Sequence, residues 1–290
     1  MVTKNNRLNE NFIQRLLICI KVIYQIIKDL TNGQTTFRLI YIKIINKFFF
    51  KPKLNDDFDW NIYHLHYKEE LEAGKKIFTL NCTTKNFKIE KNEIIKKNDK
   101  VKDLHPNHKL LYETILKINP KTILEIGCGG GDHLANLNIF NKKFKLSGVD
   151  RSFEQINTLK QRHPKLKATF KIKDITIKDC KLGTTDLIFT QAVLMHISET
   201  NDRLRFALTN ILAAAHSHVV LIENWSAHNF LNEIKKIIRN KPKFKTFKFY
   251  ISKLSSKIST RAMILSKKNL NFPKLLNYND LLQENILRTH

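Results

Sequence analysis

Cysteines are few in this sequence, and none of them stands in a C-x-x-C pair. The four are spread along the chain as Cys19, Cys82, Cys128 and Cys180. This spacing offers neither a disulfide framework nor a set of metal ligands, so we expect reduced thiols and no bound metal. Reduced thiols are typical of a cytoplasmic protein, and we predict that location.

Long apolar runs are also missing. A membrane-spanning helix needs about eighteen uninterrupted apolar residues, and no stretch of this chain provides them. The N-terminal apolar run is broken by Lys21 and Lys28 and lacks a cleavage site, which argues against a signal peptide.

Acidic residues are scarce, with 26 Asp and Glu against 51 Lys and Arg and a formal net charge of +25. Lysine, Asn, Ile and Phe are abundant while Gly, Ala and Pro are rare, as the codons of an AT-rich genome would produce. The lysines are scattered rather than gathered into arginine-rich blocks, which is not the pattern of a dedicated nucleic-acid surface. We therefore favour codon usage as the cause; a polyanionic partner such as nucleic acid, or a membrane surface, is the alternative.

The first hundred residues predict an appendage to the main domain. Apolar residues recur at helical spacing over Leu8–Leu30, and a second apolar segment covers Phe37–Phe50. We favour a helical hairpin packed on the main domain or on a partner subunit; the alternative is peripheral binding at the inner membrane face, with lysines toward anionic lipid. The aromatic segment Asp56–Tyr67 is a candidate lid or a small aromatic subdomain, and 81–103 is a linker or an exposed hairpin.

The stretch Thr122–Leu134, TILEIGCGGGDHL, holds half of the glycines of the whole chain. An apolar run that enters glycines and continues as a helical pattern predicts strand, tight turn and helix, with Asp132 as N-cap and the helix over His133–Phe140. A glycine turn at a helix N-terminus is a nucleotide-type binding site. Asp132 takes the third glycine position of the dinucleotide fingerprint G-x-G-x-x-G, and no Walker lysine follows.

Strands and helices alternate over the rest of the chain, which predicts a doubly wound, Rossmann-like parallel α/β sheet. Helices are expected at 107–118, 152–162, 202–215 and 228–239, and further strands at 144–150, 169–173, 186–190 and 218–222. Two final strands, 244–252 and 262–266, have no helical pattern between them. They predict an antiparallel terminal pair.

Four motifs, LEIGCGGG, GVD, KD and TDLIFTQAVLMHI, stand at the ends of predicted strands. In this order they resemble a class I S-adenosylmethionine-dependent methyltransferase of the small-molecule type. The resemblance covers about 105–267 and implies S-adenosylmethionine as the cofactor. We divide the chain into an N-terminal extension (1–104), the methyltransferase domain (105–268) and a C-terminal tail (269–290).

The resemblance implies a cofactor role for the central turn. Gly127, Gly129 and Gly131 would let the backbone approach the methionyl part of the cofactor. Glu125 would orient the turn and reach the cofactor's amino group; the alternative is an ordinary charge at a strand end.

Further roles fall at the ends of later strands. Asp150 would accept both ribose hydroxyls, or else cap the next helix, and its distance from Gly127 suits a βαβ unit. Asp174 would accept from the adenine amino group, with Ile175 against the ring; the alternative is a turn aspartate. Gln191 would line the cleft. His196 would take a proton from a hydroxyl acceptor, or else serve as a structural histidine.

Two absences narrow the acceptor. Thr190-Gln191-Ala192-Val193 replaces the Asn/Asp-Pro-Pro-Tyr/Phe of the family's amino-methylating members on nucleic acids and glutamine, and no Pro-Cys nucleophile is present. We predict methyl transfer to a small-molecule or saccharide acceptor, with oxygen as the favoured atom. The alternatives are an RNA methyltransferase, a non-catalytic binding protein of the same fold and, less favoured, a nicotinamide oxidoreductase.

Overall fold

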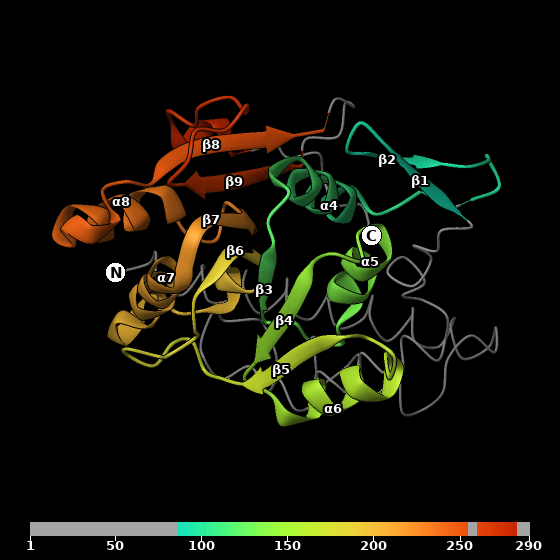
Figure 1. The fold of residues 1–290 in the computed structure, drawn as a ribbon. Helices are drawn as coiled ribbons and strands as arrows, with labels where there is room; N and C mark the ends of the chain where they lie inside the picture. The colour runs from blue at the N-terminus through green and yellow to red at the C-terminus, as the bar shows by residue number, and fades with distance from the viewer. Residues whose placement is uncertain (1–85, 102, 255–259, 283–290) are drawn as a thin grey trace, which may run out of the picture. The chain divides into compact units, whose positions relative to one another are not determined.

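The computed structural model describes residues 86–101, 103–254 and 260–282, which all belong to one unit (Figure 1). The predicted helices at 8–30 and 37–50 and the candidate lid at 56–67 lie outside the described residues.

A seven-stranded sheet organises the fold, with strand order β5-β4-β3-β6-β7-β9-β8 (Figure 1). The strands are β3 (Thr122–Ile126), β4 (Lys145–Asp150), β5 (Ala168–Ile172), β6 (Thr185–Gln191), β7 (Ala215–Ile222), β8 (Lys248–Lys253) and β9 (Arg261–Ser266). The first five in the sheet order are parallel, whereas β9 runs antiparallel to both β7 and β8. The predicted Rossmann-like sheet with an antiparallel terminal pair is confirmed.

Helices cover both faces of the sheet, as Figure 1 shows. One face packs against α4 (Pro106–Ile118), α5 (Asp132–Phe140) and α6 (Phe153–Arg162), the other against α7 (Arg203–Ala214) and α8 (Phe230–Asn240). Short 3-10 helices complete the described fold: η2 (Leu194–His196), η3 (Thr200–Asp202), η4 (Pro242–Phe244) and η5 (Tyr278–Asp280).

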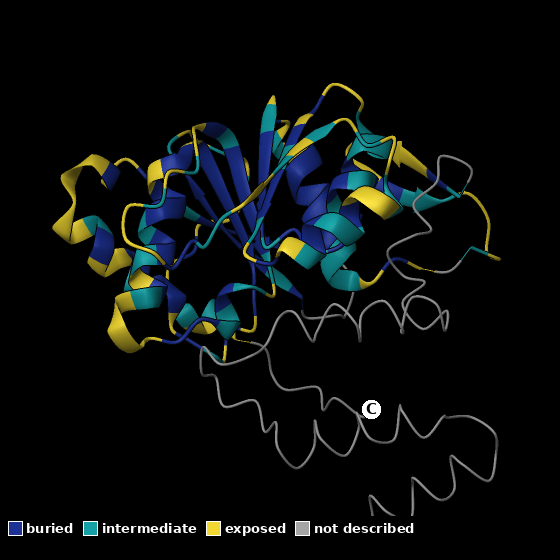
Figure 2. Cartoon of the chain, turned by 90° about the horizontal axis from the view of Figure 1, so that it is seen from below, coloured by how far each residue is buried: buried dark blue, intermediate teal, exposed yellow. Residues whose placement is uncertain are grey.

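Alternation along the central strands explains why two helical layers are needed. In β3, Ile123 packs toward α4 and α5, while Leu124 and Ile126 pack toward α7. Successive residues of a strand point to opposite faces, so a strand that is apolar throughout must be buried on both. Figure 2 shows the result, with buried strands between helices whose outer faces are exposed.

The segment before α4 forms a hairpin, which confirms the hairpin alternative for part of 81–103. Strands β1 (Phe87–Glu90) and β2 (Glu93–Lys96) are joined by Lys91 and Asn92, with φ angles of 49° and 67°. Two successive positive φ angles match the twist of a two-residue hairpin turn. Phe87 and Ile94 enter the same core as α4, and the Ile94 N–H donates to Glu113 Oε1 at 2.9 Å.

Residues beyond β9 also contribute to the core, because Leu275 and Leu281 are buried against the α7 and α8 layer. The division into 1–104, 105–268 and 269–290 drawn from the sequence stays a prediction. Within the described ranges, no helix is long and apolar enough to cross a membrane.

Candidate functional site

A cavity of about 420 Å³ opens at the carboxyl ends of β3, β4 and β6. In an open parallel sheet this edge, where the strand order reverses, is the usual ligand site. Every site residue named from the sequence lines the cavity: Glu125, Gly127, Gly129, Gly131, Asp150, Asp174, Ile175, Gln191 and His196.

The glycine turn needs its glycines for two different reasons. Gly127, Gly129 and Gly131 have φ angles of 67°, 45° and 79°, a region that residues with a Cβ rarely adopt. A Cβ at Gly127 would lie 2.5 Å from Val193, and one at Gly131 would lie 2.4 Å from Leu159. At Gly129 a Cβ would meet only Gln155 Oε1, at an ordinary contact distance of 3.7 Å, so there the positive φ and not a lack of space requires glycine.

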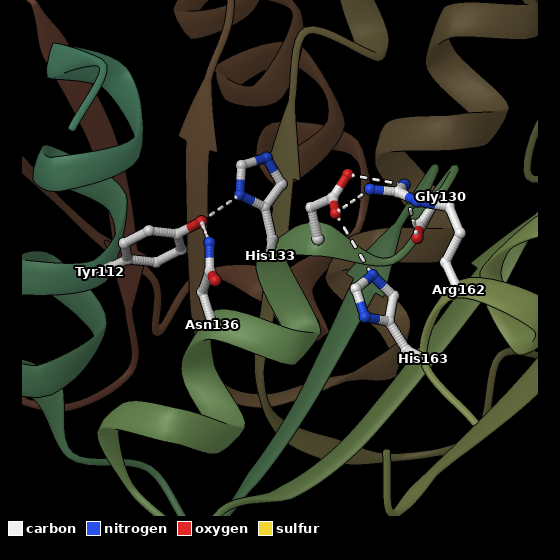
Figure 3. A network of polar contacts seen from close by, with 7 residues as sticks. Tyr112, Gly130, His133, Asn136, Arg162 and His163 are labelled. Atoms are coloured by element: carbon white, nitrogen blue, oxygen red, sulfur yellow. Dashed lines mark hydrogen bonds and ion pairs between the residues drawn. The ribbon is translucent and has the colours of Figure 1, made fainter. Parts of the chain in front are cut away.

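Helix α5 begins at Asp132, and Gly131 is its N-cap in the left-handed conformation. The prediction of Asp132 as N-cap is therefore wrong. The Asp132 carboxylate instead receives a bidentate pair from Arg162, Nη2 to Oδ1 at 2.6 Å and Nη1 to Oδ2 at 2.9 Å (Figure 3). His163 Nε2 lies 3.3 Å from Oδ1, and Arg162 also donates to the Gly130 carbonyl oxygen at 3.2 Å.

Asp150 ends β4 and braces the glycine turn. Its Oδ2 accepts from the Gly129 N–H at 2.9 Å and its Oδ1 from the Ser152 N–H at 2.9 Å. Burial raises the pKa of Asp150, while these two N–H groups and the Arg151 charge oppose the rise. Ser152, not Asp150, caps α6, because its hydroxyl accepts from the Gln155 N–H at 3.3 Å.

Asp174 follows β5 and shapes its own turn. Its Oδ1 accepts from both the N–H and the hydroxyl of Thr176, at 2.8 and 2.7 Å. These bonds match the turn-aspartate interpretation, and the residue also lines the cavity together with the buried side chain of Ile175.

Two buried oxygen atoms in the cavity wall have no hydrogen-bond partner within the described residues: Glu125 Oε2 and Gln191 Oε1. Glu125 is only 2% exposed, and burial raises its pKa well above the usual value, with further contributions from the Asp132 and Asp150 charges. An unpaired buried acceptor carries a desolvation penalty, which a ligand bearing N–H donors would remove.

A histidine cluster lines the same cavity and was missed at the level of the sequence. His105 and His108 come from the start of α4, and His133 from the start of α5. The rings of His108 and His133 meet edge to face, with centroids 4.8 Å apart. Burial lowers the pKa of His108 to about 2 and that of His133 to about 4, so both imidazoles are neutral near pH 7.

A hydrogen-bonded chain fixes His133, as Figure 3 shows. Asn136 Nδ2 donates to the Tyr112 hydroxyl at 2.9 Å, and that hydroxyl lies 2.8 Å from His133 Nδ1. From the sequence, only a helix over 107–118 was expected around Tyr112.

His196 ends η2, and burial lowers the pKa of its imidazole. Its backbone N–H donates to the Val193 carbonyl oxygen at 3.1 Å. The side chain lines the cavity, where a neutral imidazole can accept a proton.

Comparison with known proteins assigns the chain to a family. A family model described as a methyltransferase domain matches residues 119–276, more than half of the chain. No curated protein sequence matches this chain.

Three solved structures are similar at low identity. A TehB-like S-adenosylmethionine-dependent methyltransferase from Corynebacterium glutamicum has 17% identity and a TM-score of 0.46, over 72% of this chain and 97% of that one. The N-methyltransferase NodS from Bradyrhizobium japonicum has 17% identity and a TM-score of 0.41, over 58% and 91%. The plantazolicin methyltransferase BpumL has 15% identity and a TM-score of 0.42, over 56% and 82%. On the family match, the chain belongs to the class I S-adenosylmethionine-dependent methyltransferases, with S-adenosylmethionine as the cofactor.

Proposed function

We propose that this protein transfers a methyl group from S-adenosylmethionine to an oxygen atom of a small-molecule or saccharide acceptor. The observation that carries the cofactor assignment is a pair of acceptors in a glycine-lined cavity, Glu125 Oε2 and Gln191 Oε1, for which the described part of the chain supplies no donor. A cofactor with an ammonium group and no phosphate suits such a wall, whereas a pyrophosphate beside Glu125 would add like charge.

Each part of the cofactor has residues suited to hold it. Glu125 and Gln191 would accept hydrogen bonds from the methionyl amino group, and Gly129 would let the chain pass close to the backbone. Asp150 would accept the ribose hydroxyls, because each carboxylate oxygen has a second lone pair beyond the one used by a backbone N–H. Asp174 and Ile175 would hold the adenine edge and face.

When bound, S-adenosylmethionine supplies a methyl group already activated by a sulfonium centre. The chain's own contribution is then mainly positioning of the acceptor within the cavity. His196 would accept the hydroxyl proton as the acceptor oxygen forms its new bond to carbon. Burial lowers the pKa of His196, which favours the neutral imidazole, the form that can accept a proton.

The oxygen acceptor is supported by the segment after β6. Residues 190–193, Thr-Gln-Ala-Val, stand where the family's amino-methylating members on nucleic acids and glutamine carry Asn/Asp-Pro-Pro-Tyr/Phe. A neutral imidazole nearby is a group that a hydroxyl needs and that an uncharged amine does not.

Transfer of a carbon-13-labelled methyl group to a panel of saccharides, phenols, amines and RNA tests the proposal. We expect an O-methyl product, identified by its carbon chemical shift, and a fall in kcat of about a hundredfold or more in His196→Asn. His216→Asn, which changes an exposed histidine on β7, is the matched control and should leave kcat unchanged. Transfer to amines or RNA alone would overturn the acceptor class, and cofactor binding without any transfer would indicate a binding protein.

A further inference from the structure

Glu223 follows β7 directly and is 8% exposed, yet it lies outside the cavity lining. Its carboxylate accepts hydrogen bonds from a neighbouring part of the chain, and three of them have well-defined geometry. Oε1 accepts from the Thr190 hydroxyl at 2.7 Å and the Val193 N–H at 3.2 Å, and Oε2 accepts from the Met195 N–H at 3.1 Å. All three donors belong to the end of β6 or to the segment that follows it.

That segment, residues 192–196, forms one wall of the cavity through Ala192, Val193 and His196. Ala192 has a φ of 53°, a left-handed conformation that is unfavourable for a residue with a Cβ and needs support from its surroundings. One support is the Ala192 N–H, which donates to the Ile222 carbonyl oxygen at 2.9 Å. The Glu223 carboxylate supplies the next two, at Val193 and Met195.

The residues of this wall include one that contacts the glycine turn and one that is the candidate base. Val193 stands so close to Gly127 that a Cβ at Gly127 would lie 2.5 Å from it, and His196 ends η2, the short helix whose N-cap is Val193. A change at Glu223 would therefore reach both the glycine turn and the candidate base without touching a ligand.

We propose that Glu223 is a positioning residue for the cofactor site. Its carboxylate keeps residues 192–196 in the conformation in which Val193 covers Gly127 and His196 lines the cavity. The identity of the ligand in this proposal rests on the function proposed above. The contact between Glu223 and residues 192–196 can be tested on the protein without a ligand.

The ionisation of Glu223 makes its hydrogen bonds to residues 190–195 depend on pH. Burial raises its pKa to about 7, against the opposing effect of hydrogen bonds from Thr190, Met195, Val193 and Leu194. Only the ionised carboxylate accepts with both oxygens, so these hydrogen bonds weaken as pH falls below about 7. The titratable side chain on the held segment itself is His196, whose pKa burial lowers.

Glu223→Gln tests the proposal, because it keeps the shape of the side chain and replaces one acceptor oxygen with an NH₂ donor. At pH 8 we expect about tenfold weaker binding of S-adenosylhomocysteine, and about tenfold faster hydrogen exchange at the Val193 and Met195 amides. Between pH 8 and pH 6 the wild-type affinity should fall more steeply than that of the variant, in which only the other ionisable groups of the site titrate. This difference in pH dependence separates a role of the carboxylate from a general packing defect.

The matched control is Glu113→Gln, a second buried glutamate, which accepts the Ile94 N–H at 2.9 Å outside the cavity. It should alter stability and leave the affinity within twofold. Should Glu223→Gln fail to fold, Thr190→Val removes a single donor and is expected to act in the same direction with smaller effect.

Unchanged affinity and unchanged exchange at Val193 and Met195 in a folded Glu223 or Thr190 variant would overturn the proposal. Failure of the wild-type protein to bind S-adenosylhomocysteine would contradict the cofactor site instead, and the amide exchange would still decide the role of Glu223.

Discussion

Gly127 and Val193 meet so closely that a Cβ added at position 127 would lie 2.5 Å from Val193 Cγ2. Gly127 belongs to the turn after β3, and Val193 to the segment after β6. The turn and the segment both line the cavity, and they touch at this pair.

Gly127→Ala should therefore weaken S-adenosylhomocysteine binding by at least about tenfold, through the clash with Val193 as well as backbone strain. Gly183→Ala is the control, because Gly183 also has a positive φ, 83°, but a Cβ there would meet nothing within 4 Å. We expect Gly183→Ala to lower the melting temperature slightly and to leave the affinity unchanged in calorimetry. Equal losses of affinity in both variants would show that strain alone, not the contact, matters.

Arg162→Met should destabilise the protein by about 3–5 kcal/mol, since it leaves the Asp132 carboxylate buried without its ion pair. The two side chains are 16% and 5% exposed, with a shortest distance of 2.6 Å. The pair Arg205–Asp202 has the same 2.6 Å distance but is 54% and 50% exposed. Arg205→Met should therefore lower the stability by at most about 1 kcal/mol. Urea unfolding of both variants measures the difference, and similar values would refute a special role for the buried pair.

Acid should destabilise the fold through His133. Its pKa is about 4 in the folded protein, below the usual 6.5, so between these pH values the unfolded chain binds a proton that the folded chain does not. Stability contributed by neutral His133 is present above pH 6.5 and is lost as pH falls toward 4, by up to about 3 kcal/mol.

The measurement is the free energy of unfolding of wild type and His133→Gln from pH 7 to pH 4.5. The difference between the two isolates His133 from Glu223, whose raised pKa acts in the opposite direction over this range. His216→Gln, at an exposed position, serves as the control. Parallel curves for wild type and His133→Gln would contradict the prediction.

The hydrogen bonds that link Asn136, Tyr112 and His133 predict the tautomer of His133. The Asn136 amide donates to the Tyr112 oxygen, which leaves the hydroxyl proton for His133 Nδ1. Nitrogen-15 NMR should therefore show the proton of neutral His133 on Nε2. Tyr112→Phe should abolish this preference. A proton found on Nδ1 in the wild type would contradict the prediction, because His133 would then donate to the Tyr112 hydroxyl.

Strand ends were the part of the site that the sequence could predict. A buried parallel strand is mostly apolar, so a carboxylate at or just beyond its end, such as Glu125, Asp150 or Asp174, stands out at the carboxyl edge of the sheet. The glycines from Gly127 to Gly131 mark the turn, because glycine readily adopts the positive φ angles found there. Neighbouring parallel strands bring these positions together, and the cavity contains them all.

Residues that act through contacts between distant segments could not be found in this way. Glu223 was visible as a polar residue after β7, but its donors lie about thirty positions earlier and are adjacent only because β6 pairs with β7. Asp132 was misread because a local pattern cannot show Arg162, thirty positions away, or the left-handed conformation of Gly131. His108 and His133 sit on different helices that meet only in the folded chain.

Calorimetric titration with S-adenosylhomocysteine, with NAD in parallel, tests the cofactor site most directly. We expect the homocysteine derivative to bind, NAD not to bind, and Asp150→Ala to weaken binding roughly ten- to a hundredfold. Asp186→Ala is the control, because Asp186 also accepts two backbone N–H groups, at 3.0 Å each, but outside the cavity lining. Binding of NAD instead, or an affinity that Asp150→Ala leaves unchanged, would contradict the assignment of this cavity to S-adenosylmethionine.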